Sequence, residues 1–239
     1  MNKNHLKYLP LLLCFFSIQI FSQYGEKQFS LSFSANYTTT ARFFLNPNAI
    51  QKLLREENVE LVDIYSGSID FRYRISESII IGLGTEYIEK VSKQRNVIGF
   101  PSQLAGVEVE EGFRMIPIEL SVYYYIPFST ENFKFFMGGG AGIYIGEYIR
   151  DFANVGLLNV NRDFSWGIHG RLGMEYMLTD YFSVRGEMKF RDPDFKMESK
   201  YDKEFFTYEG SIRVLPQEAF PTRVNIDGMT FSIGAVLHF

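Results

Sequence analysis

The sequence predicts an all-β protein: an eight-stranded antiparallel up-and-down transmembrane β-barrel with long extracellular loops. Three observations predict it. Eight segments alternate between apolar and polar side chains, short and long connections between them follow each other in turn, and aromatic residues make up 17% of the chain. Aromatic side chains favour the pleated surface of a strand.

The alternation is the first of these signals. In the segment 29–37, Phe29, Leu31 and Phe33 alternate with serines, and the other segments repeat the pattern with different residues. Such a period of two is typical of a strand with one apolar face. The eight segments are 29–37, 69–74, 79–87, 116–124, 135–145, 166–176, 182–190 and 231–239. The number of segments, eight, agrees with the even number of strands in bacterial barrels.

The connections between the segments give the second signal. The short ones are Ile75 to Ser78, Pro127 to Phe133 and Thr179 to Tyr181. The long, polar ones are Thr38 to Ile64, Glu89 to Gly112, Arg150 to Asp163 and Arg191 to Gly228. A meander whose two ends lie on one side has short turns there and long loops on the other side. We therefore expect the long connections to be extracellular loops.

The N-terminus has the pattern of an export signal. Lys3 and Lys7 provide a basic start, and Leu9 to Phe21 is almost wholly apolar. This run is too short to span a bilayer as a helix and fits the core of a signal peptide. The sequence predicts a cleaved signal peptide over 1–23 and an outer-membrane barrel domain over 24–239.

Composition excludes some classes of partner and bond. The net charge of −4 argues against a nucleic-acid partner, which would require a basic surface. The only cysteine is Cys14, so no intramolecular disulfide can form. Leu13 is bulkier than the residue that normally precedes a lipoprotein cysteine, which argues against a lipid anchor at Cys14.

The volume of the barrel interior decides which face of the wall is apolar. The interior of an eight-stranded barrel is only just wide enough for side chains to fill it, and the large apolar set would overfill it. We therefore place the apolar set against lipid and the polar set inside, where charges must be paired. The predicted lumen charge network is Arg72, Arg74, Glu86, Glu119, His169, Arg171, Glu175, Arg185, Glu187 and Lys189.

Aromatic residues cluster near the two ends of the predicted strands. Amphipathic rings prefer the two membrane–water interfaces. The predicted interface aromatics are Tyr37, Tyr65, Tyr73, Tyr87, Trp166, Tyr176 and Phe182.

Two local features depart from the pattern. Pro117 cannot donate a backbone hydrogen bond, so we expect a β-bulge there or a position near the outer rim. The stretch Asn48 to Val62 has apolar residues at helical spacing, including Ile50 and Leu53. It predicts a short helix covering the barrel mouth, with a mobile loop as the alternative.

Three segments carry a family resemblance: Met115 to Ile118, which opens a strand; the glycine-rich Phe136 to Gly146; and Phe231 to Phe239, which ends on an aromatic residue. They resemble outer-membrane barrels of the OmpA, OmpX and opacity types, and are most similar to the Bacteroidota PorT-like barrels. The resemblance implies outer-membrane location, recognition of Phe239 by the barrel-assembly machinery, and no catalytic residues to carry over. PorT-like members are linked to protein secretion and gliding.

Candidate chemical sites have plain structural alternatives. The run Gly138 to Gly142 lacks the Lys-Ser/Thr of a phosphate loop and is better explained by inward glycines that relieve crowding. The inward charges are better explained by a structural ion-pair network than by an acid–base site. The only histidines after the signal segment, His169 and His238, fall on the inward face, whereas a lipid hydrolase needs its Ser–His pair toward the bilayer.

Acidic residues of the last long connection give one more candidate. Three lysines interleave with them, which favours a solvated surface over a cation site. The acidic residues are Asp192, Asp194, Glu198 and Asp202, and the lysines are Lys196, Lys200 and Lys203.

The sequence favours a structural or interaction barrel whose extracellular loops contact a ligand or a surface protein partner. The alternatives are a narrow pore for ions or small solutes, a component of a protein secretion system, and a lipid-modifying enzyme. We expect a monomer in outer-membrane lipid with no enzymatic activity, cofactor, metal or nucleic-acid partner.

Overall fold

A computed structural model describes residues 27–44, 47–99, 104–130, 132–162, 164–208 and 210–239. The predicted signal peptide, residues 1–23, lies outside this part of the chain. Within it, no helix is long and apolar enough to cross a membrane.

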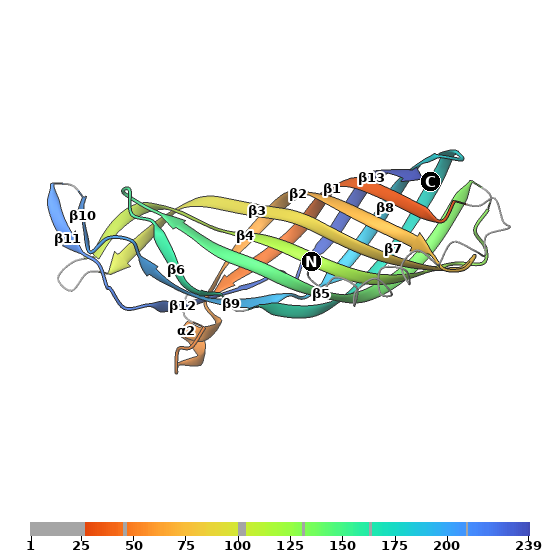
Figure 1. Cartoon of the computed structure of the whole chain (residues 1–239). Helices are drawn as coiled ribbons and strands as arrows, with labels where there is room; N and C mark the ends of the chain where they lie inside the picture. Colours follow the sequence, from red (N-terminus) through yellow and green to blue (C-terminus); the bar gives the residue numbers. More distant parts are fainter. Residues whose placement is uncertain (1–26, 45–46, 100–103, 131, 163, 209) are drawn as a thin grey trace, which may run out of the picture.

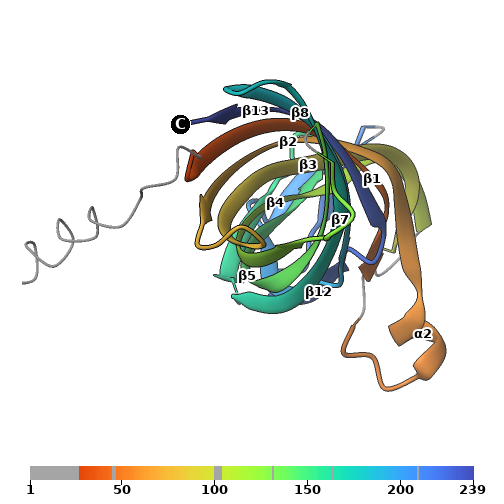
Figure 2. The same ribbon diagram turned by 90° about the vertical axis from the view of Figure 1, so that its right-hand side faces the viewer.

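Eight strands form a closed antiparallel barrel, which confirms the predicted fold class (Figures 1 and 2). Each strand pairs with the next, and the last closes the ring on the first over the register Ser30↔His238 to Thr38↔Thr230. The barrel strands are β1 (Phe29–Phe44), β2 (Asn58–Arg74), β3 (Ile79–Gly99), β4 (Leu104–Tyr125), β5 (Phe133–Asp151), β7 (Ser165–Thr179), β8 (Phe182–Arg191) and β13 (Met229–His238).

The exterior of the closed ring is apolar. Phe33, Leu83 and Leu120 are each about half exposed, and Ile168 is 73% exposed. We call this surface the belt. It comprises the outward side chains of 29–37, 65–74, 79–87, 116–124, 133–143, 166–176, 182–190 and 229–239. The side chains between them point inward, where Arg72, Glu119 and Arg171 are buried.

The long connections contain further strands, which extend the barrel wall beyond the belt. Strands β1 to β5 continue beyond the belt, and β12, β9 and β6 extend the wall from β1, as in the pair Arg42↔Asn225. We call this part the head, and it comprises residues 39–44, 47–64, 88–99, 104–115, 144–162, 164, 192–208 and 210–228. Its further elements are α2 (Lys52–Glu56), β6 (Leu157–Arg162), β9 (Asp194–Tyr201), β10 (Phe205–Tyr208), β11 (Ser211–Val214) and β12 (Phe220–Asn225).

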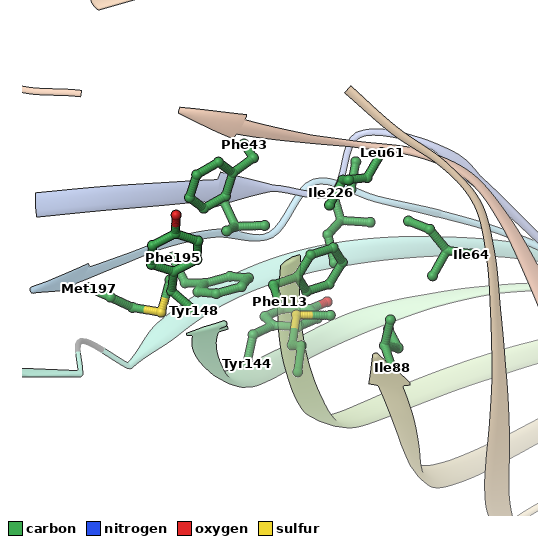
Figure 3. Close-up of a cluster of buried hydrophobic side chains, with 13 residues drawn as sticks. Phe43, Leu61, Ile64, Ile88, Phe113, Tyr144, Tyr148, Phe195, Met197 and Ile226 are labelled. Atoms are coloured by element: carbon green, nitrogen blue, oxygen red, sulfur yellow. The ribbon is translucent and has the colours of Figure 1, made fainter. Parts of the chain in front are cut away.

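Side-chain polarity reverses between the belt and the head. Inside the head most inward positions are apolar and pack into two clusters, and in the larger one Phe43, Phe113 and Phe195 are almost completely buried (Figure 3). Polar side chains occupy many of the outward positions there, as Glu89 and Arg114 show. This is the normal arrangement for a β-structure surrounded by water. The alternation thus continues beyond the belt with inside and outside exchanged.

Two strands also change phase where the head begins. In β2, Ile64 and Leu61 are both buried, although three positions apart, because Val62 and Asp63 both turn outward. Asp63 has a φ of 56°, which belongs to the left-handed region. The Tyr37 hydroxyl donates a hydrogen bond of 2.8 Å to Asp63 Oδ1 and stabilises this turn of the chain.

Pro117 does not form a bulge. The β3–β4 register is the same at Thr85↔Ile118 and at Ile88↔Met115, and the pairs between them are missing. The Thr85 hydroxyl donates to the Pro117 carbonyl oxygen over 2.9 Å. The missing N–H is therefore accommodated by a skipped pair in the ladder.

The predicted helix within 48–62 is the five-residue α2, but it does not cover the barrel mouth. It projects from the side of the molecule (Figures 1 and 2). Ile50 and Leu53 are almost fully exposed, so the apolar spacing there does not reflect packing against the barrel.

Close approach of β4 and β5 generates a stability prediction. A Cβ on Gly140 would lie 1.9 Å from the Leu120 carbonyl oxygen, whereas one on Gly186 would meet nothing within 4 Å. Gly140→Val should destabilise the folded barrel by about 1–3 kcal/mol or more through overpacking. Gly186→Val should change stability by less than about 0.5 kcal/mol. Urea unfolding in detergent micelles measures both, and equal midpoints would contradict the proposed packing.

Candidate functional site

The interior of the belt section holds a buried network of paired charges. Its carboxylates are Asp70, Glu86, Glu119, Glu175 and Glu187, and its cations are Arg72, Arg171, Arg185, Lys189 and Arg191. The network thus contains five carboxylates and five cations and is neutral overall. Inward glycines and serines on neighbouring strands leave room for these long side chains.

The end of the network near the short turns centres on Glu175. Arg185 Nε donates to Glu175 Oε2 over 2.9 Å, and Arg185 Nη2 lies 2.9 Å from the same oxygen. Ser183 donates to it over 2.6 Å, and His238 Nε2 lies 2.9 Å from it. Glu175 is completely buried, so these partners replace the water that a free carboxylate would bind.

The middle of the network centres on Glu187 and Asp70. Glu187 accepts hydrogen bonds from Arg72 over 2.7 Å and from Arg171 over 2.9 Å. Arg72 also donates to Asp70 and lies over the Tyr123 ring, 3.7 Å from its centroid. One aromatic face and two carboxylates thus hold the Arg72 guanidinium.

The end nearest the head centres on Glu86 and Glu119. Glu86 accepts from Lys189 over 2.9 Å and from Arg191 over 2.7 Å. Glu119 accepts from Lys189 over 3.1 Å and from Arg171. Because Arg171 also contacts Glu187, it connects this end to the middle.

The structure brings most of the predicted lumen residues into these ion pairs. His169 instead shares a hydrogen bond of 2.8 Å with Ser121, and Arg74 lies over the Tyr125 ring at 5.6 Å. The predicted set missed Asp70 and Arg191. Asp70 shares the inward face with Arg72, which could have identified it, whereas Arg191 had been placed in a loop.

Little space remains among these side chains. The cavity lined by the network has a volume of about 30 Å³, which is room for about two water molecules. Directly beyond it the apolar cluster of the head fills the interior, with Ile88, Phe113 and Met115 buried. The interior is therefore too full for a solute to pass without rearrangement.

Two Ser–His pairs lie in the interior, but their surroundings are not those of a nucleophile. Ser183 Oγ lies 2.8 Å from His238 Nε2 and donates its proton to Glu175, so its hydrogen is not directed to the histidine. Ser183 is fully buried, and the cavity beside His238 measures about 10 Å³. A substrate has no room to reach this serine. The arrangement is suited to stabilising the fold.

The head contains its own buried polar group. The Tyr148 hydroxyl donates to Glu111 over 2.8 Å, and Arg150 Nε lies 3.3 Å from the same carboxylate oxygen. Burial raises the pKa of Tyr148 well above its ordinary value, so this hydroxyl stays a hydrogen-bond donor at neutral pH.

The acidic residues of the last long connection do not converge on a cation site. Asp194 pairs with Arg223 over 2.6 Å, Asp202 accepts from the Gly156 backbone over 2.9 Å, and Asp192 accepts from Asn225. In the described part of the chain, no group of three or more His, Cys, Asp or Glu side chains could hold a metal ion.

The predicted interface aromatics lie at the two ends of the belt. Toward the head, Tyr37 and Tyr65 pack with ring centroids 5.4 Å apart, and Tyr87 and Trp166 are exposed. Toward the short turns lie Tyr73, Tyr176 and Phe182. Phe239 ends the chain at the same level, and its backbone exchanges two hydrogen bonds of 2.9 Å with Phe29.

Comparison with known proteins identifies the fold. No family model matches the chain, and no curated protein matches it. Among solved structures, the outer membrane protein OprG from Pseudomonas aeruginosa superposes with a TM-score of 0.57 at 16% identity, covering 90% of this chain and 96% of that one. Neisserial surface protein A (0.47, 13%, 88% and 97%) and Ail of Yersinia pestis (0.45, 9%, 90% and 99%) are more distant. The predicted closeness to PorT-like barrels is not confirmed.

Removal of one buried carboxylate should test the network. Glu119→Ala leaves Lys189 and Arg171 with fewer partners in a buried site and should destabilise the barrel by about 3–5 kcal/mol. The matched control is Glu89→Ala, which breaks the half-exposed pair of Glu89 with Arg114 and should cost about 0–1 kcal/mol. Urea unfolding in micelles measures both, and a Glu119→Ala cost as small as the control would show that the lumen pairs contribute little.

Proposed function

We propose that this protein is an integral barrel of the bacterial outer membrane that presents a rigid head to a protein partner at the cell surface. The belt supports the membrane location because large apolar side chains cover the outside of a closed ring. Closure of β13 on β1 leaves no unpaired strand edge in the belt, which hydrocarbon requires. The exposed aromatic residues at both ends of the belt fit the two interfaces.

The chain ends support the same proposal. The apolar segment within 1–23 would direct export and be removed. The last strand, β13, and Phe239, which follows it, would be read by the barrel-assembly machinery. The short turns would then face the periplasm and the head would face the exterior, as in other barrels of this type.

The observation that carries the interaction role is an apolar surface on the β10–β11 hairpin. On one face of this two-stranded sheet, Phe205 is 60% exposed, Ile212 72% and Val214 69%. The register pairs Phe205 with Val214 and places Ile212 two pairs further along, opposite Thr207 and on the same face. The opposite face packs on the head through Phe206, which is buried. We call the exposed face the hairpin patch.

The hairpin patch lies at the opposite end of the molecule from the C-terminus (Figure 1). An exposed cluster of large apolar side chains on a surface that faces water is typical of a protein contact site. The two-stranded sheet is held by packing on the head, so the patch is presented with little conformational freedom to lose on binding. A protein partner with a complementary apolar surface fits it best.

Disruption of the patch should abolish that contact. The triple variant Phe205→Ser, Ile212→Ser and Val214→Ser should lower cross-linking to surface proteins in intact cells by about tenfold or more, because the apolar contact area is lost. The control is Leu158→Ser with Val160→Ser, which changes two similarly exposed apolar residues on β6. Equal cross-linking by both variants would refute the hairpin patch as the contact site, and the captured partner would show whether a secretion apparatus is involved.

A pore is the alternative function, and the filled interior argues against it. The purified protein in planar bilayers should give no steps of stable conductance, because the lumen cavity of about 30 Å³ holds at most one or two waters. Glu119→Ala serves as a comparison, since it removes one of the side chains that fill the lumen. Reproducible conductance steps of the wild-type protein would favour the pore over a closed barrel.

A further inference from the structure

The belt is not uniformly covered with side chains. One row of paired residues runs across four strands as Val122, Gly139, Gly170 and Phe190, and all four belong to the outward face. Its two central members have no side chain. In the adjacent row, Leu120 and Ile168 flank Ala141, which is also small. The outer wall is therefore hollowed along β5 and β7.

This hollow is a groove with a volume of about 420 Å³. Its walls are the outward side chains of neighbouring strands, each roughly half exposed. Tyr123 and Arg171, whose side chains point inward, also contribute to its floor. The neighbouring Gly138 and Gly170 have no side chains that would cover them. The lining residues are Val122, Tyr123, Tyr124, Met137, Gly138, Gly170, Arg171, Leu172 and Phe190.

The chemistry of the groove selects an apolar occupant. Val122, Met137 and Leu172 offer only hydrocarbon and thioether groups to a bound molecule. The volume lies within the range of ordinary small-molecule sites, about 300–1,000 Å³. A surface depression that nothing fills forfeits dispersion contacts along its whole lining. A flexible hydrocarbon chain can follow an irregular groove of this kind and restore those contacts.

We propose that this groove holds one hydrocarbon chain of a membrane lipid, bound more tightly than the lipids elsewhere around the belt. The inference rests on the proposed membrane location, because the groove would then open toward the hydrocarbon layer. Its floor includes Gly138 and Gly170, and the missing side chain at the outward position Gly170 leaves room for a single chain. A second protein would need a broader and flatter surface to dock, and the half-exposed side chains around the groove interrupt such a surface.

The chain offers a matched pair of variants. A Cβ on Gly170 would meet nothing within 4 Å, and the same holds for Gly186 on the neighbouring strand. Both glycines face outward from the belt, but only Gly170 lines the groove. Gly170→Leu should fill the groove without touching the lumen, and Gly186→Leu should add the same side chain outside it.

Native mass spectrometry of the full-length protein, extracted from its own membrane in a mild detergent, tests the proposal. The wild-type protein and Gly186→Leu should retain one lipid mass per chain, and Gly170→Leu should retain it about tenfold less often. Equal retention by the two variants, or no retained lipid in the wild type, would overturn the proposal. A mass of two protein chains that appears for the wild type and for Gly186→Leu, but not for Gly170→Leu, would also overturn the proposal. It would indicate that a second copy of the protein occupies the groove.

A separate readout distinguishes this proposal from the membrane location on which it rests. All three proteins should show the electrophoretic mobility shift on heating that folded membrane barrels show, and should sediment with outer membranes. If they do so without retaining lipid, only the groove assignment fails. If they do not enter the membrane, both proposals fail together.

Discussion

Closure of the ring between β13 and β1 is the constraint on which the rest of the structure depends. With eight strands the interior has a fixed and narrow width, so inward side chains must be small or must share the space in pairs. Long charged residues such as Arg171 are tolerated only because each meets opposite charges at hydrogen-bond distance. The glycines and serines between them are equally necessary, because their small side chains leave room for the long charged ones.

The belt could be predicted from the sequence because its physics is local. An apolar residue at every second position, with small or charged residues between, identifies a wall between two different environments. The head could not be predicted in the same way. Beyond the belt the outer face of the wall contacts water. Polar residues such as Glu89 therefore lie on the outer face there, whereas Ile88 and Phe113 point inward. The composition then resembles that of a polar loop, although the alternation continues. The phase change at Asp63 obscures the pattern further.

The lumen network shows a similar division. The inward register alone indicated which charges share the interior, but not which of them meet, because that depends on contacts between strands far apart in sequence. Glu86 and Arg191 are 105 positions apart and pair over 2.7 Å. Arg191 escaped prediction since β8 extends further than its apolar face suggests. Arg74 lies at the end of the network, over the Tyr125 ring.

A filled interior moves the search for function to the exterior of the molecule. In the belt section paired charges fill the lumen, and in the head an apolar core does so, which leaves no through-path among the described residues for a solute to follow. The surfaces that remain unexplained by folding are the hairpin patch around Ile212 and the groove at Gly170. Neither is required for the ring to close: the patch exposes side chains that the head does not need to bury, and the groove omits side chains that the wall could accommodate. Features that cost the fold contacts without serving closure are where selection for binding is expected to be visible, one toward the aqueous exterior and one toward lipid.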